Sequence, residues 1–115
     1  MTPEGKFQKR VIEAATRLGW RHYHAHDPRR DKAGFPDLVM VRRGRLIFAE
    51  LKRDKKAIKH EVSKEQDEWL FALMNVRHNV ENLIRAKGAY APGQSPVQVF
   101  LWCPDDFDQI LEALK

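Results

Sequence analysis

Residues 35–52 are the part of the sequence that most constrains the fold of this chain. They read FPDLVMVRRGRLIFAELK, in which two apolar runs flank the short polar segment 42–45. Apolar strands of this length on both sides of a tight turn are typical of a β-hairpin. We therefore predict two antiparallel strands at residues 38–41 and 46–51.

The two ends of this hairpin carry charged side chains. Asp37 precedes the first strand, and Glu50 and Lys52 lie at the end of the second. Side chains two positions apart share a face of a strand, so Glu50 and Lys52 point the same way, and Asp37 can lie across the sheet from them. Two carboxylates on strands suit Mg²⁺, which prefers oxygen ligands, and Lys52 adds a positive charge beside them. The alternative is an acid at a strand end and an exposed salt bridge, without a metal.

Length and composition favour one domain over residues 1–115. No apolar run approaches the roughly 20 residues of a transmembrane helix, and the N-terminal residues lack the apolar region of a signal peptide. The single Cys103 cannot form an internal disulfide or a thiolate metal site, which agrees with a reducing compartment. We therefore expect a cytoplasmic protein that does not associate with a membrane.

Charge is distributed unevenly along the chain. Residues 1–60 contain 16 Lys or Arg and 7 Asp or Glu, whereas residues 61–115 contain 5 and 9. The basic half also contains the hairpin. A positive field favours a polyanionic partner, and contacts of Lys and Arg with phosphates are the usual source of nucleic-acid affinity. A basic surface without a specific partner is the alternative.

Residues 3–18 have the pattern of an amphipathic helix. Thr2 and Pro3 suit the cap and the first turn of a helix, and Gly19 suits its end. Glu4 lies near the apolar stripe, so it would face the sheet unless it only complements the helix dipole. The apolar stripe consists of Phe7, Val11, Ala14, Ala15 and Leu18.

Other elements follow from local patterns. Residues 20–26 alternate as a short strand, and residues 27–34 form a polar, basic loop. Residues 52–60 are expected to be a flexible basic loop, because they carry five Lys or Arg. Residues 75–96 combine helical and loop features, and residues 97–102 form a strand.

Two further helices complete the prediction. Ser63 and Gln66 match the capping box that begins one helix. Asp105 or Asp106 would cap the last one. The resulting order is α-β-β-β-α-(α)-β-α, with a second helix in residues 75–96 left open. Strands grouped first, followed by a strand reached through a helix, predict an α/β fold with a mixed sheet flanked by helices.

Short motifs in this order resemble those of a known family. They are Gly34-Phe35-Pro36-Asp37, Glu50-Leu51-Lys52, and Gln66 with Trp69. The set resembles the VRR-NUC branch of the PD-(D/E)XK nuclease superfamily. Weaker matches extend the resemblance over residues 3–75 and 97–114, and they comprise Glu4 with Phe7 and Gln8, Gly19-Trp20, Tyr23-His24 and Trp102-Cys103-Pro104. Two features depart from the family: segment 75–96 is long, and Cys103 stands where an Arg is common.

The resemblance implies a restriction-endonuclease-like fold, with a mixed central β-sheet flanked by helices. It implies a site on which five side chains converge: Glu4, Asp37, Glu50, Lys52 and Gln66. Family members of this size are stand-alone domains, often from phages, that act as homodimers on branched DNA such as four-way (Holliday) junctions. The expected activity is therefore a Mg²⁺-dependent, structure-selective DNA endonuclease, for which Mn²⁺ would substitute. If the chain is phage-encoded, it would act in the cytoplasm of the host cell.

The metal ligands and the residue beside them have separate expected roles. Asp37 and Glu50 would bind the metal directly, and the Leu51 carbonyl would be a third ligand. Lys52 would orient the attacking water or help to deprotonate it, and it would stabilise negative charge in the transition state.

Two helices would support these residues. Glu4 would act through a water molecule or bind a second ion. Gln66 would donate or accept a hydrogen bond at Lys52 or at the phosphate. The capping box alone would also account for Gln66.

Phosphate contacts are expected from the basic loops beside the acidic strands. The candidates in these loops are Arg29, Arg30, Lys32, Lys55, Lys56 and Lys59, and solvated charge is the alternative. His24 would contact a phosphate or pack near the site. A zinc site built from His22, His24 and His26 is less favoured, because histidines on one strand need a further ligand from elsewhere.

Two other functions fit the same sequence. A nicking or restriction-type nuclease would act on ordinary duplex DNA, and a non-catalytic module would only bind nucleic acid. The cluster of Asp37, Glu50 and Lys52 argues against the binding module, because carboxylates that face a polyanion weaken its binding.

Overall fold

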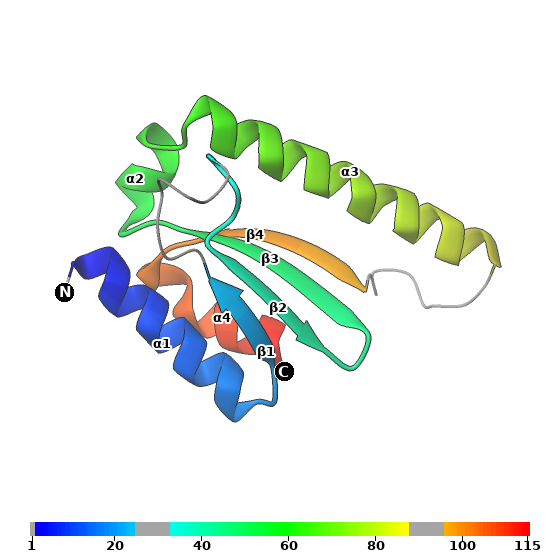
Figure 1. The fold of residues 1–115 in the computed structure, drawn as a ribbon, viewed down its shortest axis with the longest axis horizontal. Helices are drawn as coiled ribbons and strands as arrows, with labels where there is room; N and C mark the ends of the chain where they lie inside the picture. Colours follow the sequence, from blue (N-terminus) through cyan, green and yellow to red (C-terminus); the bar gives the residue numbers. More distant parts are fainter. Residues whose placement is uncertain (1, 25–32, 88–95) are drawn as a thin grey trace.

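The structure is a computed structural model that describes residues 2–24, 33–87 and 96–115, with the backbone alone in residues 78–87. Apart from a short helix at residues 55–60, which the sequence did not predict, helices and strands follow one another in the predicted order (Figure 1). Their bounds are α1 Pro3–Arg17, β1 Arg21–His24, β2 Leu38–Arg42, β3 Arg45–Leu51, α2 Lys55–His60, α3 Lys64–Lys87, β4 Val97–Trp102 and α4 Phe107–Leu114, with a 3₁₀ turn at Pro104–Asp106.

A four-stranded mixed sheet lies at the centre, with the strand order β1-β2-β3-β4. The pairs β1–β2 and β2–β3 are antiparallel, and β4 runs parallel to β3. This confirms the predicted class, an α/β domain with a mixed sheet packed against helices. The hairpin turn is also confirmed: Arg43 and Gly44 have φ angles of 48° and 79°, as two-residue hairpin turns require.

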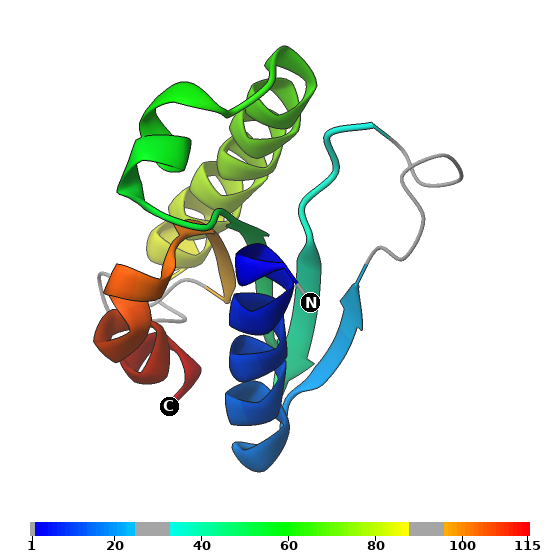
Figure 2. The same cartoon turned by 90° about the vertical axis from the view of Figure 1, so that its left-hand side faces the viewer.

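One face of the sheet is covered by α1 and α4 (Figure 2). The α1 cap forms as predicted, because the Gly5 amide donates to Thr2 Oγ1 at 3.0 Å. Gly19 has a φ of 86° just after the helix, a conformation that favours glycine. The core between these layers contains Phe7, Val11, Ala15, Trp20, Leu38, Met40, Ile47, Ala49, Leu51, Trp102, Ile110 and Leu114.

On the opposite face, α3 packs along β4 (Figure 1). Trp69 of α3 contacts Phe35 edge to face, with ring centroids 5.0 Å apart, and Phe35 in turn contacts Phe48 of β3. Trp69 therefore serves in packing. Over β1 and β2 this face is open, since Tyr23 is 59% exposed and Val41 is 45% exposed.

The expected flexible loop at residues 52–60 was wrong. Residues Lys55–His60 form α2, because the Asp54 carboxylate caps it by accepting from the Ala57 amide at 2.8 Å. Ala57 is buried. The exposed cations of this segment thus lie on a short helix that one buried side chain anchors to the domain.

The capping box at Ser63 begins α3 as predicted, and the helix continues to Lys87. Helix is therefore the outcome for the first part of segment 75–96, and residues 88–95 lie outside the described part of the chain. α4 begins directly after Asp106. Asp106 occupies the N-cap position of α4, as predicted, but its carboxylate makes no cap hydrogen bond to α4 and accepts from the Cys103 amide and from Lys55 instead. None of the helices described here is long and apolar enough to cross a membrane.

Candidate active site

The five predicted site residues come together at one end of the sheet. Asp37 precedes β2, Glu50 lies next to the end of β3, and Lys52 follows that strand directly. Gln66 lies in the first turn of α3, and Glu4 lies in the first turn of α1. Four segments of the chain therefore contribute to one cluster.

Asp37 and Glu50 form a carboxyl pair in which Glu50 is buried and Asp37 is half-buried. The Asp37 Oδ2 atom accepts a hydrogen bond from the Leu51 amide at 2.8 Å, and its negative charge acts on the Glu50 carboxyl. Glu50 is 2% exposed. Among the described residues, no donor reaches its buried Oε1 atom. In the absence of a cation, such a pair is most stable when it shares a proton.

Burial and mutual repulsion change the acidity of this pair. Burial, followed by the negative charge of Asp37, raises the pKa of Glu50 to about 8. Burial also raises the pKa of Asp37, although the Leu51 amide opposes that shift. Charge is thus costly at this position unless a cation compensates for it.

Lys52 is fixed next to the carboxyl pair. Its Nζ atom donates to the Glu61 carbonyl and to Gln66 Oε1, both at 3.0 Å, and lies 3.6 Å from Glu50 Oε2. The side chain is buried, with 8% of the residue exposed. Two acceptors and one carboxylate therefore hold the ammonium group in place.

Gln66 connects the site to the start of α3. Its Nε2 atom donates to Glu50 Oε2 at 2.7 Å, while its Oε1 atom accepts from Lys52. The same Oε1 atom accepts from the Ser63 amide at 2.9 Å, and the Gln66 amide donates to Ser63 Oγ at 3.1 Å. Gln66 thus has both of the roles that the sequence left open, in the capping box and beside the charged pair.

Gly34 lets the segment before Asp37 approach α3 closely. Its φ angle is 83°. A Cβ atom at this position would lie 2.6 Å from the Gln66 backbone nitrogen and closer still to the Glu65 carbonyl carbon. Because only glycine fits, the chain that carries Asp37 is packed directly on the helical turn that carries Gln66.

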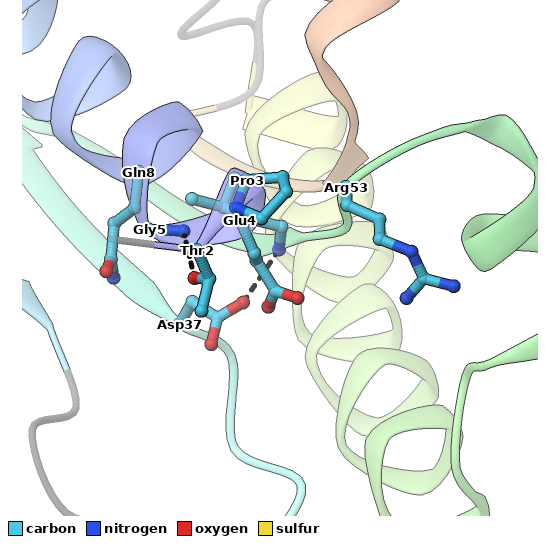
Figure 3. A pocket seen from close by; sticks show the side chains of 8 residues that line it. Thr2, Pro3, Glu4, Gly5, Gln8, Asp37 and Arg53 are labelled. Carbon is cyan, nitrogen blue, oxygen red and sulfur yellow. Dashed lines mark hydrogen bonds between the residues drawn. The ribbon is translucent and has the colours of Figure 1, made fainter.

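Glu4 and Asp37 meet in an open pocket of about 400 Å³, which Figure 3 shows. The Glu4 carboxylate points toward Asp37. Glu4 therefore faces the sheet, as the apolar stripe of α1 predicts, and complementing the helix dipole is not its only role. Burial, and then the charge of Asp37, raise the pKa of Glu4. The pocket is lined by Thr2, Pro3, Glu4, Gly5, Gln8, Asp37, Leu51 and Arg53.

Sequence reasoning missed Arg53 as part of this pocket. Its side chain lies on the far side of Glu4 in Figure 3 and forms an ion pair with Glu61. Arg53 follows Lys52 directly in the sequence, which could have suggested that it lies near the site. This signal is weak, because neighbouring side chains on an extended chain point in opposite directions.

The donor atoms fit a hard cation. In the described part of the chain, no group of three or more His, Cys, Asp or Glu side chains could hold a metal ion. Mg²⁺ does not need such a cage, because it is commonly bound through one or two carboxylates together with waters and substrate phosphates. Asp37 and Glu50 supply two carboxylates, and Glu50 Oε1 is a buried oxygen that no donor of the described residues reaches. The Leu51 carbonyl faces the same side as its amide, which is bonded to Asp37.

The predicted phosphate-binding residues have different environments. Lys56 is exposed on α2, whereas Lys55 donates to Asp106 at 2.6 Å. His24 is half-buried, and its ring stacks on that of His22. Arg29, Arg30, Lys32 and His26 lie outside the described residues.

Comparison of the chain with known protein families, with curated proteins and with solved structures finds no match.

Proposed function

We propose that this chain is a Mg²⁺-dependent nuclease of the VRR-NUC type, with a restriction-endonuclease-like fold, that hydrolyses phosphodiester bonds in DNA. One observation carries the proposal. The buried Glu50, whose Oε1 atom no donor of the described residues reaches, lies beside the half-buried Asp37 and the fixed ammonium group of Lys52. Carboxylates and an ammonium group in this arrangement match the needs of phosphate hydrolysis with a hard cation.

Electrostatics favours a metal at this site over an empty carboxylate cluster. Glu4, Asp37 and Glu50 would repel the phosphates of a nucleic acid. A cation held by these carboxylates would reverse that repulsion and would remove the cost of ionising Asp37 and the buried Glu50. A bound Mg²⁺ would neutralise charge on the scissile phosphate and make a coordinated water more acidic. Asp37, Glu50 and the Leu51 carbonyl would hold it, and Mn²⁺ would substitute.

The chain's own residues have distinct parts in this proposal. Lys52 places positive charge beside the reacting phosphate and orients the attacking water. Gln66 positions both Lys52 and Glu50 through its two amide atoms. Glu4 accepts a hydrogen bond from a water at the edge of the pocket.

The choice of nucleic acid is supported by charge and by the sequence resemblance. Residues 1–60 carry an excess of nine positive charges, and they include most of the site. Such a field favours a polyanion. The resemblance adds two parts of the proposal, namely that the substrate is branched DNA and that the protein acts as a homodimer.

A panel of labelled DNAs tests the proposal. A four-way junction, a flap, a linear duplex and a single strand are incubated with Mg²⁺, Mn²⁺ or EDTA. We expect cleavage of branched DNA with either metal and none in EDTA, and Asp37→Asn should abolish it. Preferred cleavage of the linear duplex would favour a nicking or restriction-type enzyme. Metal-independent binding without cleavage of any DNA would refute the nuclease.

A further inference from the structure

Tyr23 is an aromatic side chain to which the proposed chemistry assigns no role. It lies in β1 at the edge of the sheet, and it is 59% exposed. The flanking histidines, His22 and His24, point to the other face of the strand, where their ring centroids are 5.9 Å apart. Tyr23 therefore presents its ring on the face that α1 and α4 do not cover.

The candidate metal ligands lie at the end of the sheet next to Tyr23. Tyr23 pairs with Val39, and Asp37 lies two residues before Val39, in the bend that leads into β2. The register of β2 with β3, continued by one residue, places Glu50 opposite Asp37. The exposed ring thus stands one strand away from the carboxyl pair.

The surroundings of Tyr23 combine apolar and positive groups. Val41 is 45% exposed on this face, and the exposed Arg21 is its partner across the strands. An occupant that matches this surface has a flat apolar part and negative charge. A nucleotide has both, and a base on Tyr23 would have a phosphate on each side, one toward Arg21 and the other toward the candidate metal site.

We propose that Tyr23 stacks on an unpaired base of the DNA substrate, next to the scissile phosphate, and so makes the site selective for DNA with unpaired nucleotides. The inference rests on the proposed nuclease function. Inside a duplex, each base is stacked between its neighbours, so only a base that has left the stack can lie on a protein ring. Every base offers such a face, so this contact selects DNA structure and not base sequence.

Binding measurements in EDTA test this contact separately from catalysis. The probes are a single strand, a fully paired duplex, and the same duplex with one unpaired nucleotide. Each carries 2-aminopurine at the same position, which is the unpaired one in the last probe. The variants are Tyr23→Ala, Tyr23→Phe, which keeps the ring, and Phe71→Ala, a matched control that removes an exposed aromatic side chain from α3. Thermal unfolding checks that each variant is folded.

We expect Tyr23→Ala to lose about tenfold in affinity for the single strand and for the duplex with an unpaired nucleotide, the effect of one stacked base. Affinity for the paired duplex should be unchanged. The wild type and Tyr23→Phe should quench 2-aminopurine at the unpaired position, whereas Tyr23→Ala should not. Phe71→Ala should behave as the wild type.

Three outcomes would overturn the inference. One is an equal loss for all three DNAs, and another is no difference between Tyr23→Ala and the wild type. The third is a halving of the solution mass by Tyr23→Ala, which would assign the ring to a contact between copies of the chain. Failure of the nuclease proposal gives a different pattern, because Tyr23 would still affect binding in EDTA while Mg²⁺ produced no cleavage of any DNA.

Discussion

At the scale of single residues, the ammonium group of Lys52 is the most narrowly fixed group in the candidate site. We expect Lys52→Ala to lower the cleavage rate at least about 100-fold with Mg²⁺, because it removes the positive charge and the donor beside the reacting phosphate. Single-turnover cleavage of the best DNA of the panel measures this. Lys9→Ala, at an exposed position on α1, is the control. Cleavage by a folded Lys52→Ala protein at the wild-type rate would contradict the role of Lys52.

Glu50 gives the protein a pH-dependent stability in the absence of metal. Its pKa is raised to about 8 in the folded state, so between pH 5 and 8 the folded state binds more protons than the unfolded state. The free energy of unfolding therefore falls as pH rises through this window, by up to a few kcal/mol. Glu50→Gln should remove the fall, which urea unfolding at pH 5 and pH 8 in EDTA measures.

The control for this measurement is Glu68→Gln, at an exposed position on α3, which should keep the wild-type pH dependence. Addition of Mg²⁺ at pH 8 should stabilise the wild type more than Glu50→Gln, because the variant loses one charged ligand. A wild-type protein with the same stability at both pH values would show that Glu50 is not a buried acid.

At the scale of elements, the contact between the segment before β2 and the first turn of α3 determines how Asp37 is placed relative to Gln66. Gly34→Ala should destabilise the protein by about 1–3 kcal/mol, because the φ angle is positive and the Cβ atom would collide with the backbone of α3. Cleavage should fall further than the population of folded protein does. Urea unfolding and cleavage rates of the same samples separate the two effects.

Gly44→Ala is the matched control for Gly34→Ala. Gly44 also has a positive φ angle, but nothing lies within 4 Å of a Cβ atom built there. It should lose stability from backbone strain while the folded fraction keeps its full activity. Equal loss of activity in both variants would show that the α3 contact does not position the site.

Elements with short-range signals were predictable from the sequence. The hairpin, the α1 cap and the capping box of α3 each depend on residues that lie within a few positions of one another. The short helix α2 was not predicted. Five Lys or Arg in its segment suggested an exposed loop, whereas the helix depends on one capping aspartate and one buried alanine. The partner of the Asp106 carboxylate was not predicted either, because Lys55 lies far away in the sequence.

The candidate site was predictable in part for the same reason. The alternation of a strand places Glu50 and Lys52 on one face, and the apolar stripe of α1 brings Glu4 to the sheet. By contrast, the acceptor for Lys52 at the Glu61 carbonyl depends on the path of the chain between α2 and α3. No residue pattern encodes that path, because a backbone carbonyl is available at every position.

At the scale of the whole molecule, the uneven charge predicts salt-dependent DNA binding. Affinity should fall steeply with salt, because each neutralised phosphate releases counterions. Simultaneous Lys56→Ala and Lys59→Ala, at exposed positions on α2, should reduce the log–log slope by about 2 if both contact phosphates. Fluorescence anisotropy over a range of salt concentrations measures the slope. An unchanged slope would place α2 away from the DNA.

The proposed symmetric mechanism predicts a dimer. Light scattering at micromolar concentration should give about twice the chain mass of 13.5 kDa. Two sites related by a twofold axis would then cut opposing strands of a junction. A monomer that still makes paired cuts in a four-way junction would exclude this mechanism.

The parallel pairing of β4 with β3 has a consequence for the order in which the protein folds. Leu46 pairs with Val97 across a crossover that contains α2 and α3, whereas Asp37, Glu50 and Gln66 lie within one short stretch of chain. Closing a short loop costs less entropy than closing a long one, and local contacts form faster. Apart from Glu4, we therefore expect the proposed site residues to come together before β4 joins the sheet, and β4 contributes none of them.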